Sequence, residues 1–233
     1  MNIVGDIIAI GGGGFGRNPN QPIIEKYIIE QSPVDKPNVV FIPTASAEDT
    51  AHIVNFYKAF TNLSCTPKHI NFFQRTPRLD SILNKQDIIY VGGGNTKSML
   101  AVWREWKLDK LLLKAYNRGA LLCGVSAGAI CWFEKGVTDS WASNLSIMDC
   151  MGFLKGCCCP HYDGEKDRRP SVEKFISESK IDSCYALEDG SALHYKNGNI
   201  HTVVTFFKGA HAYKVSIKDG DIHHEAMKGL SLI

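Results

Sequence analysis

Short, almost entirely apolar segments recur along the first half of the chain and alternate with segments of helical spacing. The apolar segments lie at 6–12, 38–46, 66–73, 87–94 and 120–127, and the helical ones at 21–32, 48–63, 78–84 and 96–119. Continuous apolar strands between helices indicate a parallel sheet that is covered on both faces. Because crossover connections are right-handed, this half predicts a three-layer, doubly wound α/β fold.

The pattern changes in the second half of the chain. Residues 128–136 continue as a predicted helix, 137–151 as a loop region, and 153–165 as a strand ending in a loop, before another helix at 170–179. The tail has short apolar segments separated by the turn pairs Asp189-Gly190, Asn197-Gly198 and Asp219-Gly220. These turns predict antiparallel strands added at one end of the sheet.

Composition and charge exclude several classes of protein. The net charge is +2, with 26 basic against 24 acidic residues, so nothing suggests binding to nucleic acid or an anionic membrane. The N-terminal segment lacks a basic region and is interrupted by Asp6, unlike a secretory signal. No window approaches the roughly 20 apolar residues of a membrane helix. We therefore expect a cytoplasmic protein, and, because no linker or repeat divides it, a single domain over 1–233.

The eight cysteines include the unusual run Cys157-Cys158-Cys159. In a cytoplasmic chain of this size we expect reduced thiols rather than disulfides. Adjacent cysteines of a strand point in different directions and chelate one metal poorly, and the chain contains no C-x-x-C pair. We expect these residues to be small buried apolar side chains, and we expect neither a metal nor a cofactor.

Four predicted strands end in sequences that suggest ligand binding, because open α/β sheets bind ligands at the carboxyl ends of their strands. These sequences lie at 11–16, 43–46, 92–96 and 124–129. The first fits the dinucleotide pattern G-x-G-x-x-G through Gly11, Gly13 and Gly16. However, the second strand lacks the acidic residue that this pattern requires, and the residues at 16–22 do not begin a helix. We therefore expect a glycine-rich turn there.

The segment at 124–129 has the G-x-S-x-G pattern at a strand-to-helix junction, which is typical of a nucleophile elbow. Such a turn exposes the hydroxyl of Ser126, and Gly124 and Gly128 let the strand and the helix approach closely. The N–H of Ala127 then faces a developing oxyanion, with a second donor from the glycines at 92–94. The alternative is a serine that caps a helix, which the apolar context disfavours.

A serine nucleophile needs a base, and His161 is the candidate. It follows an apolar strand and Pro160, where strand ends should converge. The other histidines lie on a predicted helix, on a strand or in the hairpin-rich tail, at His52, His69, His194, His201, His211, His223 and His224. The candidate carboxylates for orienting the imidazole are Glu188, Asp139, Asp163 and Glu165, and the pattern alone does not choose among them.

The motifs YVGGGNT, GVSAGAI, PHYD and ALEDGSAL occur in this order, and the chain resembles the dipeptidase E (α-aspartyl dipeptidase) and cyanophycinase family of serine peptidases. The resemblance implies a fold like that of class I glutamine amidotransferases, and a metal-free hydrolase of small peptides. By position, it implies that Ser126 is the nucleophile and His161 the base. It matches Glu188 to the proposed triad acid and Asp139 to an aspartate that is also proposed to be important.

The resemblance further implies that Gly93 or Gly94 joins Ala127 in binding the oxyanion. Asn95 and Thr96 match the end of the glycine motif that faces the substrate. Acidic substrates would require a cation such as Arg168 or Arg169, although general surface statistics favour solvated arginines at a helix start. The edge strands of the tail are candidates for pairing between two copies in a homodimer.

Two other functions fit parts of the sequence. An α/β-hydrolase esterase places its acid before its histidine, so its base would be His211, His223 or His224. A non-catalytic module would keep the same pocket to bind a small ligand resembling an amino acid. The favoured hypothesis is acyl transfer to water, in which His161 takes the proton of Ser126 and returns it to the leaving amine.

Overall fold

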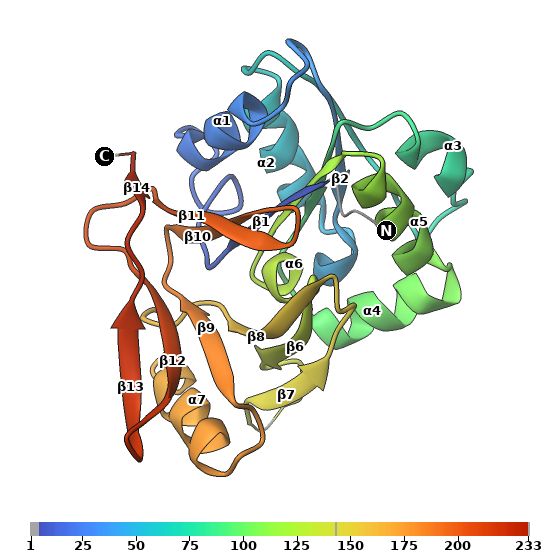
Figure 1. Ribbon diagram of the computed structural model, residues 1–233. Coiled ribbons are helices and arrows are strands. Elements are labelled where there is room, and N and C mark those ends of the chain that lie inside the picture. The colour runs from blue at the N-terminus through green and yellow to red at the C-terminus, as the bar shows by residue number, and fades with distance from the viewer. Residues whose placement is uncertain (1–4, 143, 233) are drawn as a thin grey trace.

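The computed structural model describes residues 5–142 and 144–232 of the chain. Among these residues two β-sheets form the framework (Figure 1). The larger sheet has eight strands. In spatial order they are β14 (Leu230–Ser231), β11 (Asn199–Thr205), β10 (Ser191–Lys196), β1 (Asp6–Ile10), β5 (Leu121–Val125), β4 (Ile88–Val91), β2 (Asn38–Ile42) and β3 (Thr66–His69). Five neighbouring strands, β1, β5, β4, β2 and β3, run parallel to one another, and β10 pairs antiparallel with β1.

Helices cover both faces of the larger sheet, as the sequence predicts. On one face, α1 (Ile23–Glu30) and α2 (Thr50–Phe60) share an apolar cluster with alternate residues of the strands. On the other face lie α3 (Leu79–Leu83), α4 (Thr96–Glu105) and α5 (Leu108–Asn117). Helices α4 and α5 replace the single helix predicted over 96–119, because Lys107 between them has a positive φ of 53° that a continuous helix does not allow.

The second sheet departs from the sequence expectation. The helix predicted over 128–136 is wrong: α6 (Ala127–Ile130) ends at Ile130, and a strand begins at Phe133. The physical reason is burial, since Cys131, Trp132 and Phe133 are all fully buried and a one-sided helix cannot bury three consecutive side chains. The predicted loop over 137–151 likewise contains the end of one strand and the whole of another.

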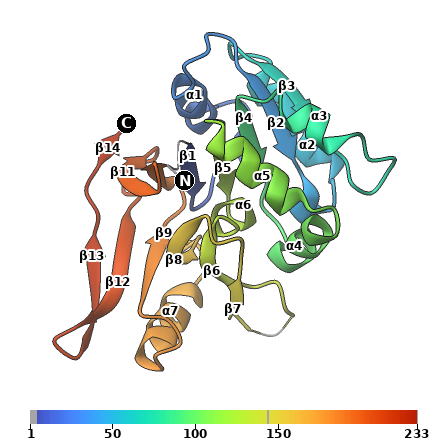
Figure 2. The same ribbon diagram turned by 45° about the vertical axis from the view of Figure 1, so that its right-hand side comes forward.

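The second sheet has six strands among the described residues. In spatial order they are β13 (Asp221–Ala226), β12 (Ala212–Lys218), β9 (Ser183–Leu187), β8 (Leu154–Cys159), β6 (Phe133–Thr138) and β7 (Ser146–Asp149). Helix α7 (Arg168–Ser177) packs on its outer face, at the end of the molecule opposite α1 (Figure 2). Its inner face contributes Phe133, Leu154 and Cys158 to the apolar cluster that lies under the larger sheet.

The strands of the tail divide between the two sheets instead of extending one end of a single sheet. Asn197-Gly198 and Asp219-Gly220 close the hairpins β10–β11 and β12–β13, and all four residues have positive φ, as type I′ turns require. In contrast, Asp189-Gly190 connects β9 of the second sheet to β10 of the larger sheet. The chain therefore crosses between the sheets directly at this pair.

The cysteine run forms the end of β8 and is buried, as predicted. Cys157 and Cys159 face the cluster under α7, whereas Cys158 faces the inner cluster. Neighbouring thiols thus point to opposite sides of the strand, which is the ordinary alternation of a β-strand. In the described ranges, no helix combines the length and the apolar character needed to cross a bilayer.

Candidate active site

Ser126 occupies a sharp turn between β5 and α6 (Ala127–Ile130). Its backbone has φ 57° and ψ −113°, a combination that residues with a side chain rarely adopt. Its N–H donates to the carbonyl of Ile10 at 3.1 Å, and its own carbonyl accepts from the N–H of Ala129 at 2.9 Å. Hydrogen bonds to β1 and to α6 therefore hold this strained conformation from both sides.

The flanking glycines allow α6 to lie directly on the sheet. A Cβ at Gly124 would be 2.8 Å from the carbonyl oxygen of Val91, and a Cβ at Gly128 would overlap the same carbonyl group. A Cβ at Gly93 would lie 3.2 Å from the Cβ of Ser126. The absence of side chains in both motifs thus brings the backbone after β4 next to the serine.

Three N–H groups around Ser126 have no backbone acceptor within residues 5–142 and 144–232. They belong to Gly93, Gly94 and Ala127. The conformation of Gly94 has φ 134°, and its Cα lies against the Ala45–Ser46 backbone so closely that any side chain would collide with it. Unpaired N–H groups at the start of a helix and in a glycine turn are the kind of donors that bind negatively charged oxygen.

His161 is held by Asp189, a residue that the sequence reasoning did not select. The imidazole Nδ1 lies 2.6 Å from Asp189 Oδ1, and the second carboxylate oxygen of Asp189 pairs with Arg17. Burial acts to raise the pKa of Asp189, but the hydrogen bonds and charges of His161 and Arg17 outweigh it and hold the pKa below its usual value. Asp189 is therefore ionised at neutral pH, and it fixes the orientation of the ring.

Glycines also make room for this pair. The N–H of His161 donates to the carbonyl of Gly11 at 3.3 Å, and the N–H of Gly190 donates to the carbonyl of Gly12 at 2.8 Å. A Cβ at Gly12 would overlap Asp189 Oδ1 and would lie 2.8 Å from His161 Nδ1. The glycine-rich turn that follows β1 thus leaves space for the imidazole and the carboxylate.

Neither of the two carboxylates named by the resemblance contacts His161. Glu188 is 7% exposed and accepts the N–H of His211 at 2.7 Å, with the His211 ring nitrogen at 3.2 Å. Asp139 pairs with Arg168 at 3.5 Å, and its side chain is 64% exposed. Of the other two candidates, Asp163 accepts the N–H of Asp189, and Glu165 binds Arg168.

Arg168 lies beneath the site, contrary to the expectation of a solvated residue at the helix start. Its side chain is 2% exposed. Its guanidinium donates to the carbonyl of Val137 at 2.9 Å and to Glu165 at 2.7 Å, and it also pairs with Asp139. It therefore ties the loop after β6 to the segment after His161. Arg169 is also not simply solvated, since it lies 4.8 Å from the centre of the Tyr162 ring.

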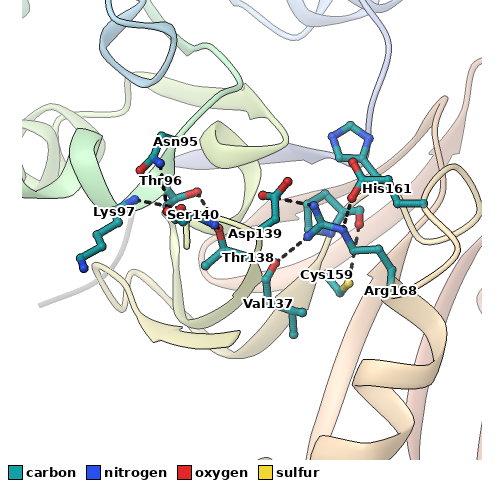
Figure 3. Close-up of polar contacts among 12 residues, drawn as sticks. Asn95, Thr96, Lys97, Val137, Thr138, Asp139, Ser140, Cys159, His161 and Arg168 are labelled. Atoms are coloured by element: carbon teal, nitrogen blue, oxygen red, sulfur yellow. Dashed lines mark hydrogen bonds and ion pairs between the residues drawn. The ribbon is translucent and has the colours of Figure 1, made fainter. Parts of the chain in front are cut away.

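The two residues that follow the second glycine motif have different positions. The side chain of Asn95 caps α4 by accepting the N–H of Ser98 at 2.9 Å, and its amide donates to the carbonyl of Ser140 at 3.2 Å (Figure 3). Thr96 is 1% exposed and its hydroxyl accepts from Thr138 at 3.5 Å. Asn95 thus borders the site, whereas Thr96 is buried behind it.

Ser126 and His161 line the same two cavities. One, of about 200 Å³, is bounded by the glycine turn after β1 and the glycines after β4. The other, of about 250 Å³, includes Asn95, Asp139 and Arg168. A third cavity, of about 940 Å³, shares Asp139 and Glu165 with the second. A serine in a strained turn, an oriented imidazole and unpaired N–H groups therefore meet at one cleft.

The histidines that the esterase hypothesis requires lie elsewhere. His211 contacts Glu188, and His224 contacts Glu173 at 3.0 Å next to α7. His223 is exposed on β13. Within the described part of the chain, none of the three borders either cavity that Ser126 lines.

Comparison with known proteins identifies the class of this molecule as a serine-type peptidase with a mixed α/β fold. Residues 7–203 match the model of peptidase family S51, and the chain belongs to that family. It is 46% identical over 218 residues to an uncharacterized peptidase, YgaJ, of Bacillus subtilis (strain 168), and the match covers 93% of this chain and 94% of that protein.

Two further matches are more distant. The chain is 27% identical over 174 residues to peptidase E of Haemophilus influenzae, covering 69% of this chain and 77% of that protein. Its fold is similar to the crystal structure of a putative peptidase E protein from Listeria monocytogenes EGD-e, with a TM-score of 0.63 and 23% identity over 87% of this chain and 98% of that one.

Proposed function

We propose that this S51 family member hydrolyses small peptides through a Ser126–His161–Asp189 triad and an acyl-enzyme intermediate. One observation carries the assignment. The imidazole that lines both cavities together with Ser126 has its Nδ1 bound to Asp189 at 2.6 Å. This contact fixes the tautomer in which Nε2 is free to accept a proton from the serine hydroxyl.

The reaction begins when Ser126 Oγ attacks the carbonyl carbon of the scissile bond and its proton passes to His161 Nε2. The N–H of Ala127 and that of Gly93 or Gly94 stabilise the oxyanion of the tetrahedral intermediate. The imidazolium then protonates the leaving amine, which departs and leaves an acyl-serine. Water, deprotonated by the same imidazole, hydrolyses the ester and restores the hydroxyl. The strained turn at Ser126 corresponds to a nucleophile elbow in this mechanism.

Asp189 is the best candidate for the acid of the triad because, of five carboxylates, the four predicted ones and Asp189 itself, it alone has a hydrogen bond to the imidazole in the described residues. Its pairing with Arg17 keeps it ionised and limits its rotation. Glu188, one position earlier, instead fixes the segment around His211. Asp139 pairs with Arg168 in the lining of the second cavity, which makes it a candidate for contact with substrate.

The substrate class is proposed as small peptides rather than aspartyl peptides alone. The Haemophilus influenzae relative is named peptidase E, which supports a peptide substrate. However, Arg168, the buried cation of the second cavity, is already paired with Glu165 and Asp139. An acidic side chain of a substrate would have to compete with these two carboxylates, so the geometry does not favour aspartate over other residues.

A fluorophosphonate reagent tests whether this cleft is catalytic or only binds ligands. We expect covalent labelling of Ser126, because the reagent reacts with a serine that an imidazole activates. Peptide mapping by mass spectrometry identifies the labelled residue, and Ser126→Ala is the control that should remain unlabelled. Intact protein that binds small peptides but resists the reagent would favour the non-catalytic binding module instead.

Gly12→Ala tests the space around the imidazole and the carboxylate. The new Cβ would overlap Asp189 Oδ1, so the contact between Asp189 and His161 must break or the turn must move. We expect kcat/KM to fall about 100-fold or more, because a misoriented base loses most of its contribution. Gly209→Ala is the control: its Cβ would meet nothing within 4 Å, and Gly209, unlike Gly12, has a positive φ, so this variant carries backbone strain without a collision at the imidazole. Equal activity of the two variants would contradict the proposed geometry.

A further inference from the structure

The glycine turn after β1, residues 11–17, contacts both the base and its acid. Its first residues bind the backbone of His161 and Gly190, and its last residue, Arg17, pairs with Asp189. Its middle residues, Gly13, Phe15 and Gly16, line the cavity of about 200 Å³ beside Ser126. The conformation of this turn therefore determines one wall of the cleft and the surroundings of the imidazole.

Glu25 of α1 binds the middle of this turn. Its Oε1 accepts the N–H of Phe15 at 2.6 Å, and the residue is fully buried. A Cβ at Gly14 would lie 2.8 Å from the same oxygen, so the turn rests directly on the carboxyl group. The other oxygen, Oε2, is buried and has no hydrogen-bond partner among the described residues. Glu25 is thus a buried polar group whose side-chain hydrogen bond to another residue, among the described residues, is made to the glycine turn after β1.

The surroundings of Glu25 are apolar and electrically neutral. The ring of Phe15 packs against Phe41, Phe56, Phe60 and Tyr90. Glu25 acts on two neighbouring titratable groups, Tyr90 of β4 and Cys123 of β5, and burial raises the pKa of both, so they are uncharged at neutral pH. Burial also raises the pKa of Glu25 from 4.5 to about 7, against the lowering effect of its own N–H and that of Phe15.

We propose that Glu25 is a positioning residue for the reaction: its carboxyl oxygen fixes the backbone of Phe15 and thereby holds the turn against His161, Asp189 and the cavity beside Ser126. Glu25 touches neither substrate nor the reacting atoms, and it acts only through the turn. Its function is that of a hydrogen-bond acceptor, which both the neutral and the ionised carboxyl group provide. The activity measurements below rest on the proposed function, whereas the spectroscopic one does not.

Two substitutions separate the acceptor from the charge. Glu25→Gln retains an acceptor oxygen of the same reach, so we expect kcat/KM at pH 6 to stay within about threefold of the unmodified protein. Glu25→Ala removes the acceptor and leaves the Phe15 N–H buried without a partner, so we expect at least about a tenfold loss. The rate of fluorophosphonate labelling at Ser126 should follow the same order.

Tyr90→Phe is the matched control, because it removes the neighbouring buried hydroxyl and leaves the Phe15 N–H contact intact. It should behave like the unmodified protein. A Glu25→Ala protein with full kcat/KM would overturn the proposal, as would a Glu25→Gln protein that loses as much as Glu25→Ala. If Glu25 had only a structural role, both substitutions would lower stability, and kcat/KM would not be preserved in Glu25→Gln.

The amide resonance of Phe15 gives a test that needs neither activity nor the alanine variant. In the unmodified protein it should shift with pH around a midpoint of about 7, because its acceptor titrates there, and in Glu25→Gln it should not. A Phe15 amide whose chemical shift is the same in the unmodified protein and in Glu25→Gln at every pH would overturn the proposal, because an N–H bound to the side chain at position 25 must respond when the carboxyl group is exchanged for an amide. If Ser126→Ala retained activity, the proposed function would fail, but this titration would remain a valid measurement of the contact.

The pH dependence of the free energy of unfolding provides a further comparison between the unmodified protein and Glu25→Gln. The pKa of Glu25 is higher in the folded protein than its ordinary value of 4.5, so the folded state binds more protons between pH 4.5 and about 7. The free energy of unfolding therefore decreases as pH rises through this window. We expect Glu25→Gln to remove this part of the slope in urea titrations, and an unchanged slope would contradict the buried acid.

Discussion

Ser126→Ala should lower kcat/KM for small peptides by at least about 10⁴-fold, because loss of the nucleophile leaves only the oxyanion donors and substrate binding. The fold should persist, since the contacts of Ser126 that hold the turn are made by its backbone N–H and carbonyl groups. Steady-state kinetics with a dipeptide library would measure the loss, and circular dichroism would show that the protein remains folded. Retained turnover in the purified variant would reject Ser126 as the nucleophile.

Two further substitutions sharpen this experiment. Ser177→Ala changes an exposed serine near the end of α7 and should leave the kinetics unchanged. Ser126→Gly should be as inactive as Ser126→Ala but more stable, because glycine adopts a positive φ without the strain that a side chain brings. We expect a gain of about 1 kcal/mol relative to alanine in urea unfolding. Such a gain would show that the protein stores strain at the position where it needs the hydroxyl.

Hydrophobic periodicity predicted the larger sheet well because four of its five parallel strands, β1, β2, β4 and β5, are buried on both faces and read as continuous apolar runs, whereas the edge strand β3 does not. In the second sheet, β6 and β7 were missed for the opposite reason. Strand β6 directly follows a short helix without a polar boundary, and its glycine, glutamate and lysine give no strand signal. Only pairing with β7 and β8 makes Phe133–Thr138 a strand, and a single sequence does not contain that information.

The site shows the same division between local and long-range information. Ser126 and His161 were predicted from local patterns, at a strand-to-helix junction and after an apolar strand. Arg168 gave no such signal, because its local pair with Glu165 does not bury it, and its other partners, Val137 and Asp139, are distant in sequence. The glycines after β1 were read as a turn, but their function depends on Asp189, which is distant in sequence.

The carboxylate that binds His161 is Asp189, one position after Glu188, which the resemblance matched to the triad acid. Glu188 and Asp189 are adjacent after β9, and successive side chains of an extended segment point in opposite directions. Which of them faces the imidazole depends on how the chain leaves β9 for the larger sheet at Gly190, where φ is 78°. A pattern of residue types cannot fix that direction, so a local signal would have selected either one.

Asp189→Asn and Glu188→Gln therefore form the decisive pair of substitutions. Asparagine at 189 no longer stabilises the imidazolium and can favour the wrong tautomer of His161, so we expect kcat/KM to fall by about 10³- to 10⁴-fold. Glutamine at 188 still offers an acceptor to the N–H of His211, so we expect less than about a tenfold change. Kinetics of the two variants over pH 5 to 9 would measure both effects.

The opposite ranking would assign the triad acid to Glu188 and would mean that the turn at Gly190 reorganises when substrate binds. The two variants also differ in a way that does not depend on turnover. Asparagine at 189 changes the hydrogen-bond partner of His161 Nδ1, whereas Glu188→Gln leaves that partner in place. The ring resonances of His161 should therefore shift in Asp189→Asn and stay unchanged in Glu188→Gln. Ring resonances of His161 that are the same in Asp189→Asn and in the unmodified protein would contradict the contact at 2.6 Å and, with it, the proposed triad.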